Sequence, residues 1–116
     1  MPAEGFRPYD RELAELYNVK RWWLGLTFGD ILDRAADHYP KKLGIVTEEV
    51  RLSYEEFRNQ VNRVAIALNK LGLRKADRVI IQLPNWIEFL LVFFGIQKIG
   101  AVGVFALPRH SQAEIE

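Results

Sequence analysis

Two histidines, two serines and scattered carboxylates are the side chains of this 116-residue chain that could take part in chemistry. His38 ends a predicted helix, where the helix dipole favours a cation. His110 follows an apolar strand, and open α/β sheets bind ligands at the carboxyl ends of their strands, but by spacing no partner nucleophile is within its reach. Ser53 and Ser111 are both explained as helix caps, and neither stands in a Gly-x-Ser-x-Gly turn. We therefore interpret these four residues as structural.

Metal and nucleotide sites are not predicted either. The chain has no cysteine, and two distant histidines give no metal-ligand spacing. There is no Walker loop, and Gly95, Gly100 and Gly103 follow a helix instead of the strand that opens a dinucleotide fingerprint. Each carboxylate is interpreted as a helix cap or as part of a solvated face. The sequence thus predicts no catalytic, cofactor-binding or metal-binding residue within the chain.

Charge and hydropathy argue against two classes of partner. The 16 basic residues nearly balance the 15 acidic ones, and the basic pairs are scattered among acids, unlike the clustered basic face that binds nucleic acid. The most apolar run, Phe89 to Ile96, is too short to span a bilayer, and Met1 to Tyr9 lacks the apolar core of a secretory signal. The absence of cysteine fits a reducing compartment, so we expect a cytoplasmic protein. From the charge and hydropathy patterns we expect it to bind neither nucleic acid nor membrane.

Residues 1–26 are predicted to form an N-terminal arm and connector. A short amphipathic helix is expected from Asp10 to Tyr17, and large rings follow at Trp22 and Trp23. We expect the paired rings to pin the arm onto the domain, since buried rings carry a large packing energy. Residues 27–116 are predicted to form a partial α/β N-terminal subdomain.

A helix and a hairpin open that subdomain. The helix begins at Thr27, has Asp30 at its third position and ends before Pro40. A hairpin is expected over 43–52 around Glu48-Glu49, a pair that two-residue turns do not favour. The predicted apolar stripe of the helix comprises Ile31, Leu32, Ala35, Ala36 and Tyr39.

The next helix has the clearest pattern in the chain. Ser53 and Glu56 form a capping box at its start, and Gly72 is well placed as its C-terminal cap. Its predicted core stripe comprises Tyr54, Phe57, Val61, Val64, Ala65, Leu68 and Leu71.

Strand, helix and strand then follow within about thirty residues, the spacing of a βαβ unit. Strands are predicted over 78–83 and 101–106, with an apolar helix over 86–99 that Asn85 and Glu88 cap and Gly100 ends. The strands should be parallel, joined by a right-handed crossover and covered on both faces. The predicted fold class is therefore α/β with packed helices.

Two features indicate the front part of a longer protein. The helix over 86–99 has no polar face and needs partners on several sides. Ser111 and Glu114 form a capping box that starts a helix with five residues left, too short to be stable by itself. We expect the bare chain to expose the 86–99 surface and to self-associate.

Five short motifs follow one another between Trp23 and Ile115. In order, they are Trp23-Leu24-Gly25-Leu26-Thr27-Phe28-Gly29-Asp30-Ile31-Leu32, Leu52-Ser53-Tyr54-Glu55-Glu56-Phe57, Leu83-Pro84-Asn85 with Glu88-Phe89, Lys98-Ile99-Gly100-Ala101-Val102, and Ala106 to Ile115. Their order resembles that of adenylate-forming enzymes. The motif that begins at Leu52 looks like the first core motif of that family, and the motif that begins at Lys98 looks like its second core motif. The first and last are similar to segments of aryl-acid–AMP ligases, the last to the 2,3-dihydroxybenzoate–AMP ligase branch.

The chain departs from the family pattern at two positions. Phe57 stands where the family usually has leucine, a change that a core tolerates. Gly103 is an additional glycine within a strand, which predicts a close approach of another backbone there.

The resemblance implies a parent enzyme that activates a carboxylic acid, here an aromatic one such as 2,3-dihydroxybenzoate, for siderophore biosynthesis. It would use ATP and Mg²⁺ to form an acyl-adenylate, release pyrophosphate and pass the acyl group to a carrier-protein phosphopantetheine or to coenzyme A. In such enzymes the phosphate-gripping loop, the acyl pocket and the catalytic lysine come later. The resemblance thus implies that this chain carries scaffold, needs the remainder of its parent and is inactive alone.

Three alternatives stay open at this point. The chain could belong to a fatty or other acyl-CoA synthetase, since these residues do not name the acid. It could be a stand-alone interaction module whose apolar helix docks a partner or its own copy. It could also be a small nucleotide-binding α/β protein, although the missing phosphate loop argues against this.

Overall fold

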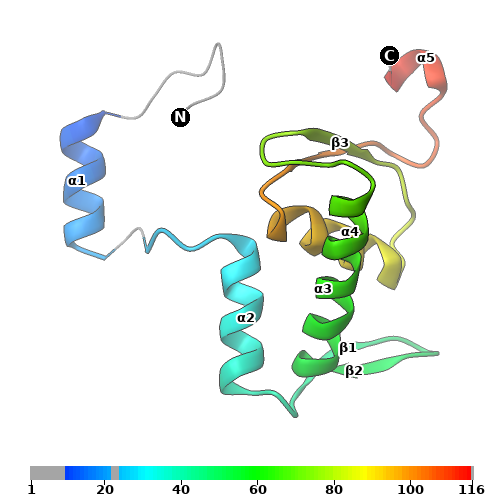
Figure 1. Ribbon diagram of the computed structural model, residues 1–116, viewed down its shortest axis with the longest axis horizontal. Coiled ribbons are helices and arrows are strands. Elements are labelled where there is room, and N and C mark those ends of the chain that lie inside the picture. The colour runs from blue at the N-terminus through cyan, green and yellow to red at the C-terminus, as the bar shows by residue number, and fades with distance from the viewer. Residues whose placement is uncertain (1–9, 22–23, 116) are drawn as a thin grey trace.

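The computed structural model describes residues 10–21 and 24–115, which form five helices and four strands (Figure 1). The helices are α1 (Arg11–Val19), α2 (Phe28–His38), α3 (Tyr54–Lys70), α4 (Ile87–Lys98) and α5 (Gln112–Ile115). The strands are β1 (Leu43–Val46), β2 (Arg51–Ser53), β3 (Arg78–Ile81) and β4 (Val102–Phe105). β1 and β2 form an antiparallel hairpin, and β3 and β4 form a separate parallel pair joined through α4. The predicted α/β class with a parallel βαβ unit is confirmed.

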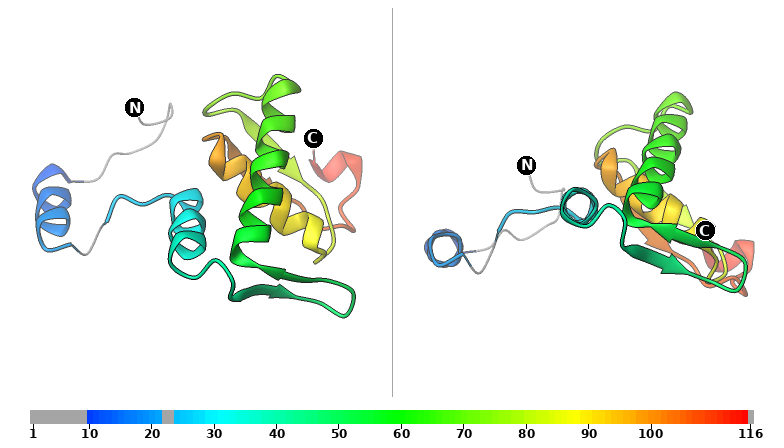
Figure 2. Two further views of the ribbon diagram at one scale, coloured as in Figure 1. Left: turned by 60° about the horizontal axis from the view of Figure 1, so that its bottom comes forward. Right: turned by 90° about the horizontal axis from the view of Figure 1, so that it is seen from below.

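α1 stands apart from the other described elements (Figures 1 and 2). Asp10 caps it by accepting the Leu13 N–H at 3.1 Å. Leu13 and Leu16 of its apolar face are exposed. The expected contact of Trp22 and Trp23 with the domain lies outside the described residues, and the division at residue 26 stays a prediction. None of the helices in the described ranges is long and apolar enough to cross a membrane.

α2 begins with a reciprocal capping box. Thr27 Oγ1 accepts the Asp30 N–H at 3.1 Å, and the Asp30 carboxylate accepts the Thr27 N–H at 3.0 Å. The bond from the Thr27 N–H is the main reason that the pKa of Asp30 lies below its ordinary value. The predicted stripe of α2 is only half right, because Leu32 and Ala36 are buried whereas Ile31 is 50% exposed.

The hairpin turns at Glu48-Glu49 because Thr47 organises the loop. The Thr47 hydroxyl accepts the N–H groups of Glu49 at 3.3 Å and Val50 at 2.9 Å. The Thr47 N–H donates to the Val50 carbonyl at 2.7 Å and closes the turn. The residue that flanks the loop therefore supplies the hydrogen bonds that make an unfavourable turn pair acceptable.

α3 starts at the predicted cap with half of the predicted box. Ser53 Oγ accepts the Glu56 N–H at 3.2 Å, and among the described residues the Glu56 carboxylate makes no return bond. Phe57 and Val61 are buried as predicted. The prediction for Leu71 is wrong: it is 80% exposed because it lies past the end of α3, in the turn that the next residue closes with a φ of 102°.

α4 begins one residue later than predicted, and Asn85 does not cap it. The N-cap is Trp86, whose side chain makes no capping bond. The Trp86 N–H donates to the Pro84 carbonyl at 2.7 Å, so a tight turn holds Asn85 ahead of the cap position. Gly100 ends the helix as predicted, with a φ of 76° in the left-handed region that glycine adopts without strain.

α4 is the centre of the fold, with α3 on one side and the β3–β4 pair on another (Figure 2). Ile96 is completely buried, and Phe94 meets Phe57 of α3 edge-on with ring centroids 5.5 Å apart. All the large apolar side chains of α4 are at least partly buried, and Trp86 is the one exposed large apolar residue of the predicted 86–99 surface. The helix is thus better covered than predicted, because α2 also packs on it.

The β3–β4 pair is covered on one face only. Ile80 pairs with Val104, and successive side chains of a strand point to opposite faces. Val79 and Ile81 pack toward α4, whereas Ile80, Val102 and Val104 form an outer face and are 50%, 49% and 43% exposed. The prediction that both faces are covered is wrong for the described residues, since none of their elements lies over this outer face.

Gly95 determines how closely α3 and α4 approach. A Cβ at Gly95 would lie 2.9 Å from Val64 Cγ1 and 3.4 Å from the backbone nitrogen of Ala65. At Gly103, by contrast, a Cβ would meet only Ile81 Cδ1 at 3.4 Å, so the prediction of a close backbone approach there is wrong within the described residues. The close approach lies at the helix crossing instead.

Gly95→Val is expected to destabilise the protein by about 1–3 kcal/mol, because the added methyl groups overpack the α3–α4 crossing. Gly103→Val in β4 is the matched control, since a Cβ there meets only Ile81 Cδ1 among the described residues, at 3.4 Å. Urea denaturation of the two variants and the wild type measures the difference. Equal losses at both positions would contradict the importance assigned to Gly95.

Candidate functional site

The carboxyl ends of β3 and β4 meet at one edge, where open α/β sheets bind ligands. Gln82 directly follows β3, and its side-chain amide donates to the carbonyls of Leu107 at 3.1 Å and His110 at 2.8 Å. The Leu107 N–H donates to His110 Nδ1 at 3.1 Å. One glutamine side chain therefore ties the loop after β4 to the end of β3.

These bonds give His110 a structural role. Because Nδ1 accepts a backbone N–H, the proton of the neutral imidazole is on Nε2. Within the described residues, no serine hydroxyl or carboxylate is hydrogen-bonded to this ring. The arrangement supports the interpretation of His110 as a loop-organising residue.

The capping box at the start of α5 is half formed. The Glu114 carboxylate accepts the Ser111 N–H at 2.7 Å, as predicted. The Glu114 N–H bonds to the Ser111 carbonyl at 3.1 Å and not to the hydroxyl, so that part of the prediction is wrong. α5 is a single turn, and a tight turn of this kind presents the carbonyl three residues back as the acceptor.

The other candidate side chains serve their own elements. Ser53 is buried and caps α3. His38 is exposed at the end of α2, where Nδ1–H donates to the Arg34 carbonyl at 2.9 Å. Among residues 10–21 and 24–115, no group of three or more histidine, aspartate or glutamate side chains is placed to hold a metal ion. The structure brings none of the predicted candidates together into a catalytic constellation.

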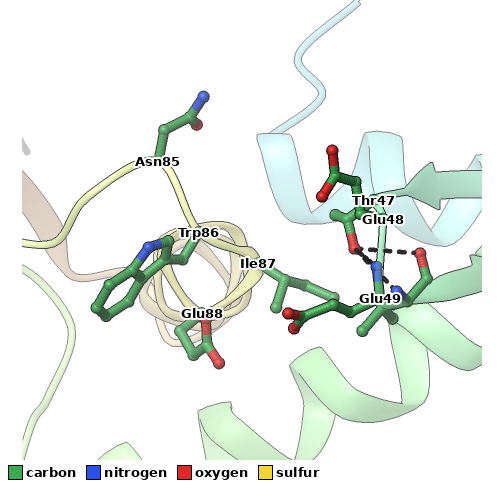
Figure 3. A pocket seen from close by; sticks show the side chains of 8 residues that line it. Thr47, Glu48, Glu49, Asn85, Trp86, Ile87 and Glu88 are labelled. Atoms are coloured by element: carbon green, nitrogen blue, oxygen red, sulfur yellow. Dashed lines mark hydrogen bonds between the residues drawn. The ribbon is translucent and has the colours of Figure 1, made fainter.

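An open cavity of about 590 Å³ lies between the hairpin turn and the start of α4 (Figure 3). Glu48 and Glu49 line it from the turn, and Trp86 and Glu88 line it from the start of the helix. Thr47, whose hydroxyl holds the turn, is part of its wall. The three glutamates are exposed, and the described lining residues include no nucleophile paired with a base. This cavity therefore offers a surface, not a reaction centre.

Two ion pairs fix α2 against its neighbours. Asp33 pairs with Lys98 of α4 at 2.5 Å, and Asp37 pairs with Arg58 of α3 at 2.6 Å. The hydrogen bond to Asp37 is the main cause that raises the pKa of Arg58 above its ordinary value. Lys98 belongs to the Lys-x-Gly-Ala motif, whose Gly100 makes the helix-to-strand turn. In this chain the motif holds helices together.

Sequence reasoning missed both Gln82 and the cavity. A polar residue directly after the apolar run 79–81 and ahead of Leu83-Pro84 is the signal that marks Gln82. The cavity has no such signal, because it exists only where the hairpin and α4 meet in space.

Residues 32–116 match the family model described as AMP-binding enzyme. The chain is 42% identical over 112 residues to the 2,3-dihydroxybenzoate-AMP ligase of Bacillus subtilis (strain 168). This match covers 97% of the chain and 21% of that relative. It is 35% identical over 116 residues to the salicyl-AMP ligase / salicyl-S-ArCP synthetase of Mycobacterium tuberculosis (strain ATCC 25618 / H37Rv), covering 96% and 20%. The chain spans about a fifth of the length of these relatives.

The apo structure of Mycobacterium smegmatis MbtA has a similar arrangement. It matches with a TM-score of 0.89 at 35% identity, over 96% of this chain and 21% of that chain. The likeness extends over nearly the whole chain, so its elements are arranged as in part of a much longer protein.

Gln82→Glu is expected to loosen the loop after β4, because a carboxylate cannot donate to the two loop carbonyls and repels both. Amide hydrogen exchange over residues 107–112 measures the effect, and we expect it to be about tenfold faster, as the loss of two hydrogen bonds predicts. Gln60→Glu makes the same change on α3 and serves as control. Unchanged exchange in Gln82→Glu would show that this side chain does not hold the loop.

Proposed function

The chain belongs to the AMP-binding enzyme family, and from this membership we propose that it is the N-terminal part of an ATP-dependent ligase for an aromatic carboxylic acid. The 42% identity to a 2,3-dihydroxybenzoate-AMP ligase over 97% of the chain carries the proposal. The proposed acid is therefore 2,3-dihydroxybenzoate or a close analogue, and the proposed process is siderophore biosynthesis in the cytoplasm.

The proposed reaction has two steps. A carboxylate oxygen of the acid attacks the α-phosphorus of ATP, so that an acyl-adenylate forms and pyrophosphate leaves. A thiol then attacks the acyl carbonyl, loses its proton to solvent and forms a thioester as AMP leaves. The acceptor is the phosphopantetheine of a carrier protein or coenzyme A, and the naming of one relative as a salicyl-S-ArCP synthetase favours the protein-bound acceptor.

No complete site for ATP and Mg²⁺ is assigned to the described part of this chain. The described residues hold no cluster of metal ligands, and the sequence has no glycine-rich loop that would grip phosphates. No step of the reaction is therefore assigned to a residue of this chain. Its proposed contribution is to form one flank of the large domain and to support the acyl pocket from behind, through α4 and the β3–β4 pair.

The whole ligase is expected to catalyse ATP–pyrophosphate exchange that depends on 2,3-dihydroxybenzoate. Salicylate and benzoate test which ring hydroxyls are needed, and octanoate tests the fatty-acyl alternative. The 116-residue chain alone is expected to give no exchange. Exchange with octanoate and not with aromatic acids would overturn the proposed substrate. Acid-dependent exchange by the isolated chain would overturn the scaffold role.

The remainder of the parent is the proposed cover for the outer face of β3–β4, formed by Ile80, Val102 and Val104. In parallel sheets both faces are buried, and the chain makes up only 21% of a relative that it otherwise matches. Without that cover, the chain is proposed to self-associate through this face. A stand-alone interaction module would use the same surface, but its association would then be the native state.

Ile80→Glu is expected to reduce self-association of the 116-residue chain, because a charge on the outer face opposes its burial. Leu71→Glu is the control, since Leu71 is 80% exposed and lies in the turn after α3. Static light scattering over a concentration series measures the mass. A wild-type chain that stays monomeric, or an equal effect of the two substitutions, would refute the role of this face.

A further inference from the structure

A groove beside α2 combines an apolar slot with an opening to solvent. The slot has a volume of about 290 Å³ and is lined from α2, β1, α3 and α4, with Leu32, Phe57 and Phe94 among its residues. A neighbouring cavity of about 450 Å³ lies toward the end of α2. Ile31, Ala35 and Tyr54 line both hollows, so the two adjoin and together are called the groove.

The opening of the groove is basic. Arg34, His38 and Lys42 line it together with Tyr39. In the described ranges, no carboxylate lies within ion-pair distance of Arg34 or Lys42. The Lys42 ammonium lies 5.6 Å from the centroid of the Tyr39 ring, a cation–π contact that holds it at the opening.

The nearby acidic residues are engaged elsewhere. Asp33 and Asp37 form the ion pairs with α4 and α3, and Asp30 caps α2. Glu55 pairs with Lys41 at 3.2 Å. Among the residues that the structure describes, no acidic side chain lines either part of the groove, so none of them neutralises the positive charge at its opening.

From this arrangement we propose that the groove binds a small carboxylate with an apolar body, such as an aromatic or medium-chain acid. The body occupies the slot above Leu32 and Phe94, and the carboxylate lies at Arg34 and Lys42. Small-molecule sites have this construction, an apolar hollow with a few convergent polar groups. The proposal goes beyond the ligase reaction, because it needs neither ATP nor a thiol, and it holds or fails independently of that reaction.

The shape of the groove favours a small ligand over a partner helix. A docked helix needs apolar contacts spaced along several turns, whereas here the apolar slot holds only about 290 Å³ and the cations stand at one end of the groove. A second copy of the chain is a further possible occupant. Both are outcomes that the experiment below distinguishes.

The test titrates 4-phenylbutyrate, and separately the neutral isostere 4-phenylbutanol, into the isotopically labelled chain. Saturable amide shifts are expected at Ala35, Gly44 and Tyr54. The carboxylate should bind about 1.5- to fivefold more tightly than the alcohol, the range of one exposed ion pair.

Two pairs of variants separate the charge from the slot. Arg34→Gln should remove the preference for the carboxylate, while Arg63→Gln on α3 leaves it unchanged. Ala35→Leu should weaken both probes at least fivefold by filling the slot, while Ala67→Leu, the same change at an exposed position of α3, has no effect.

Four results would overturn the proposal. One is the absence of saturable shifts at the groove, and another is binding that Ala35→Leu does not weaken. A third is a shift of groove residues on dilution without any probe, which would identify a second copy as the occupant. The fourth is stronger binding of an acidic amphipathic peptide than of either small probe, which would identify a partner helix.

Discussion

The crossing of α3 and α4 at Gly95 is the contact on which the rest of the structure depends. α4 has almost no polar face, so it is stable only if apolar surfaces surround it. Gly95 lets α3 approach to a distance at which even one additional carbon would touch Val64. Phe57 and Phe94 then pack edge-on across the crossing, and the β3–β4 pair covers another side of α4. The position of the strand pair follows from the position of this helix.

The motifs that identify the family are geometric devices in this chain. Ser53 caps α3, the Tyr54 ring packs so closely on Gly44 that a Cβ there would lie 2.8 Å from it, and Lys98 joins α4 to α2. Gly100 makes the turn from α4 into β4. Each device sets the place of an element, and none presents a reacting group. Fold and family can therefore be assigned from this chain, while the chemistry belongs to sites that a fold only supports.

Local signals predicted most of the elements, because caps, glycine stops and helical periodicity act within a few residues. Thr27 and Ser53 cap α2 and α3, and Gly100 ends α4, as the sequence predicts. The failures depend on contacts between distant segments or on exact turn geometry. Asn85 loses its cap position to a tight turn at Pro84, and no local pattern reports the cavity beside Trp86. The bonds of Gln82 to a loop 25 and 28 residues later are likewise beyond a local pattern.

The division of α2 into three faces shows why a stripe of apolar residues is an incomplete description of a helix. Leu32 and Ala36 face the core, while the aspartates at 30, 33 and 37 lie along a second line of the helix. The first of them accepts the Thr27 N–H, and the other two pair with Lys98 and Arg58. Ile31 and Ala35 belong to a third line, beside Arg34 and His38, and line the groove. Apolar periodicity alone merges the first and third lines into one predicted core face. The charges distinguish them, because the aspartates of the second line pair with Lys98 and Arg58 and leave the basic side chains of the third line to solvent or to a ligand.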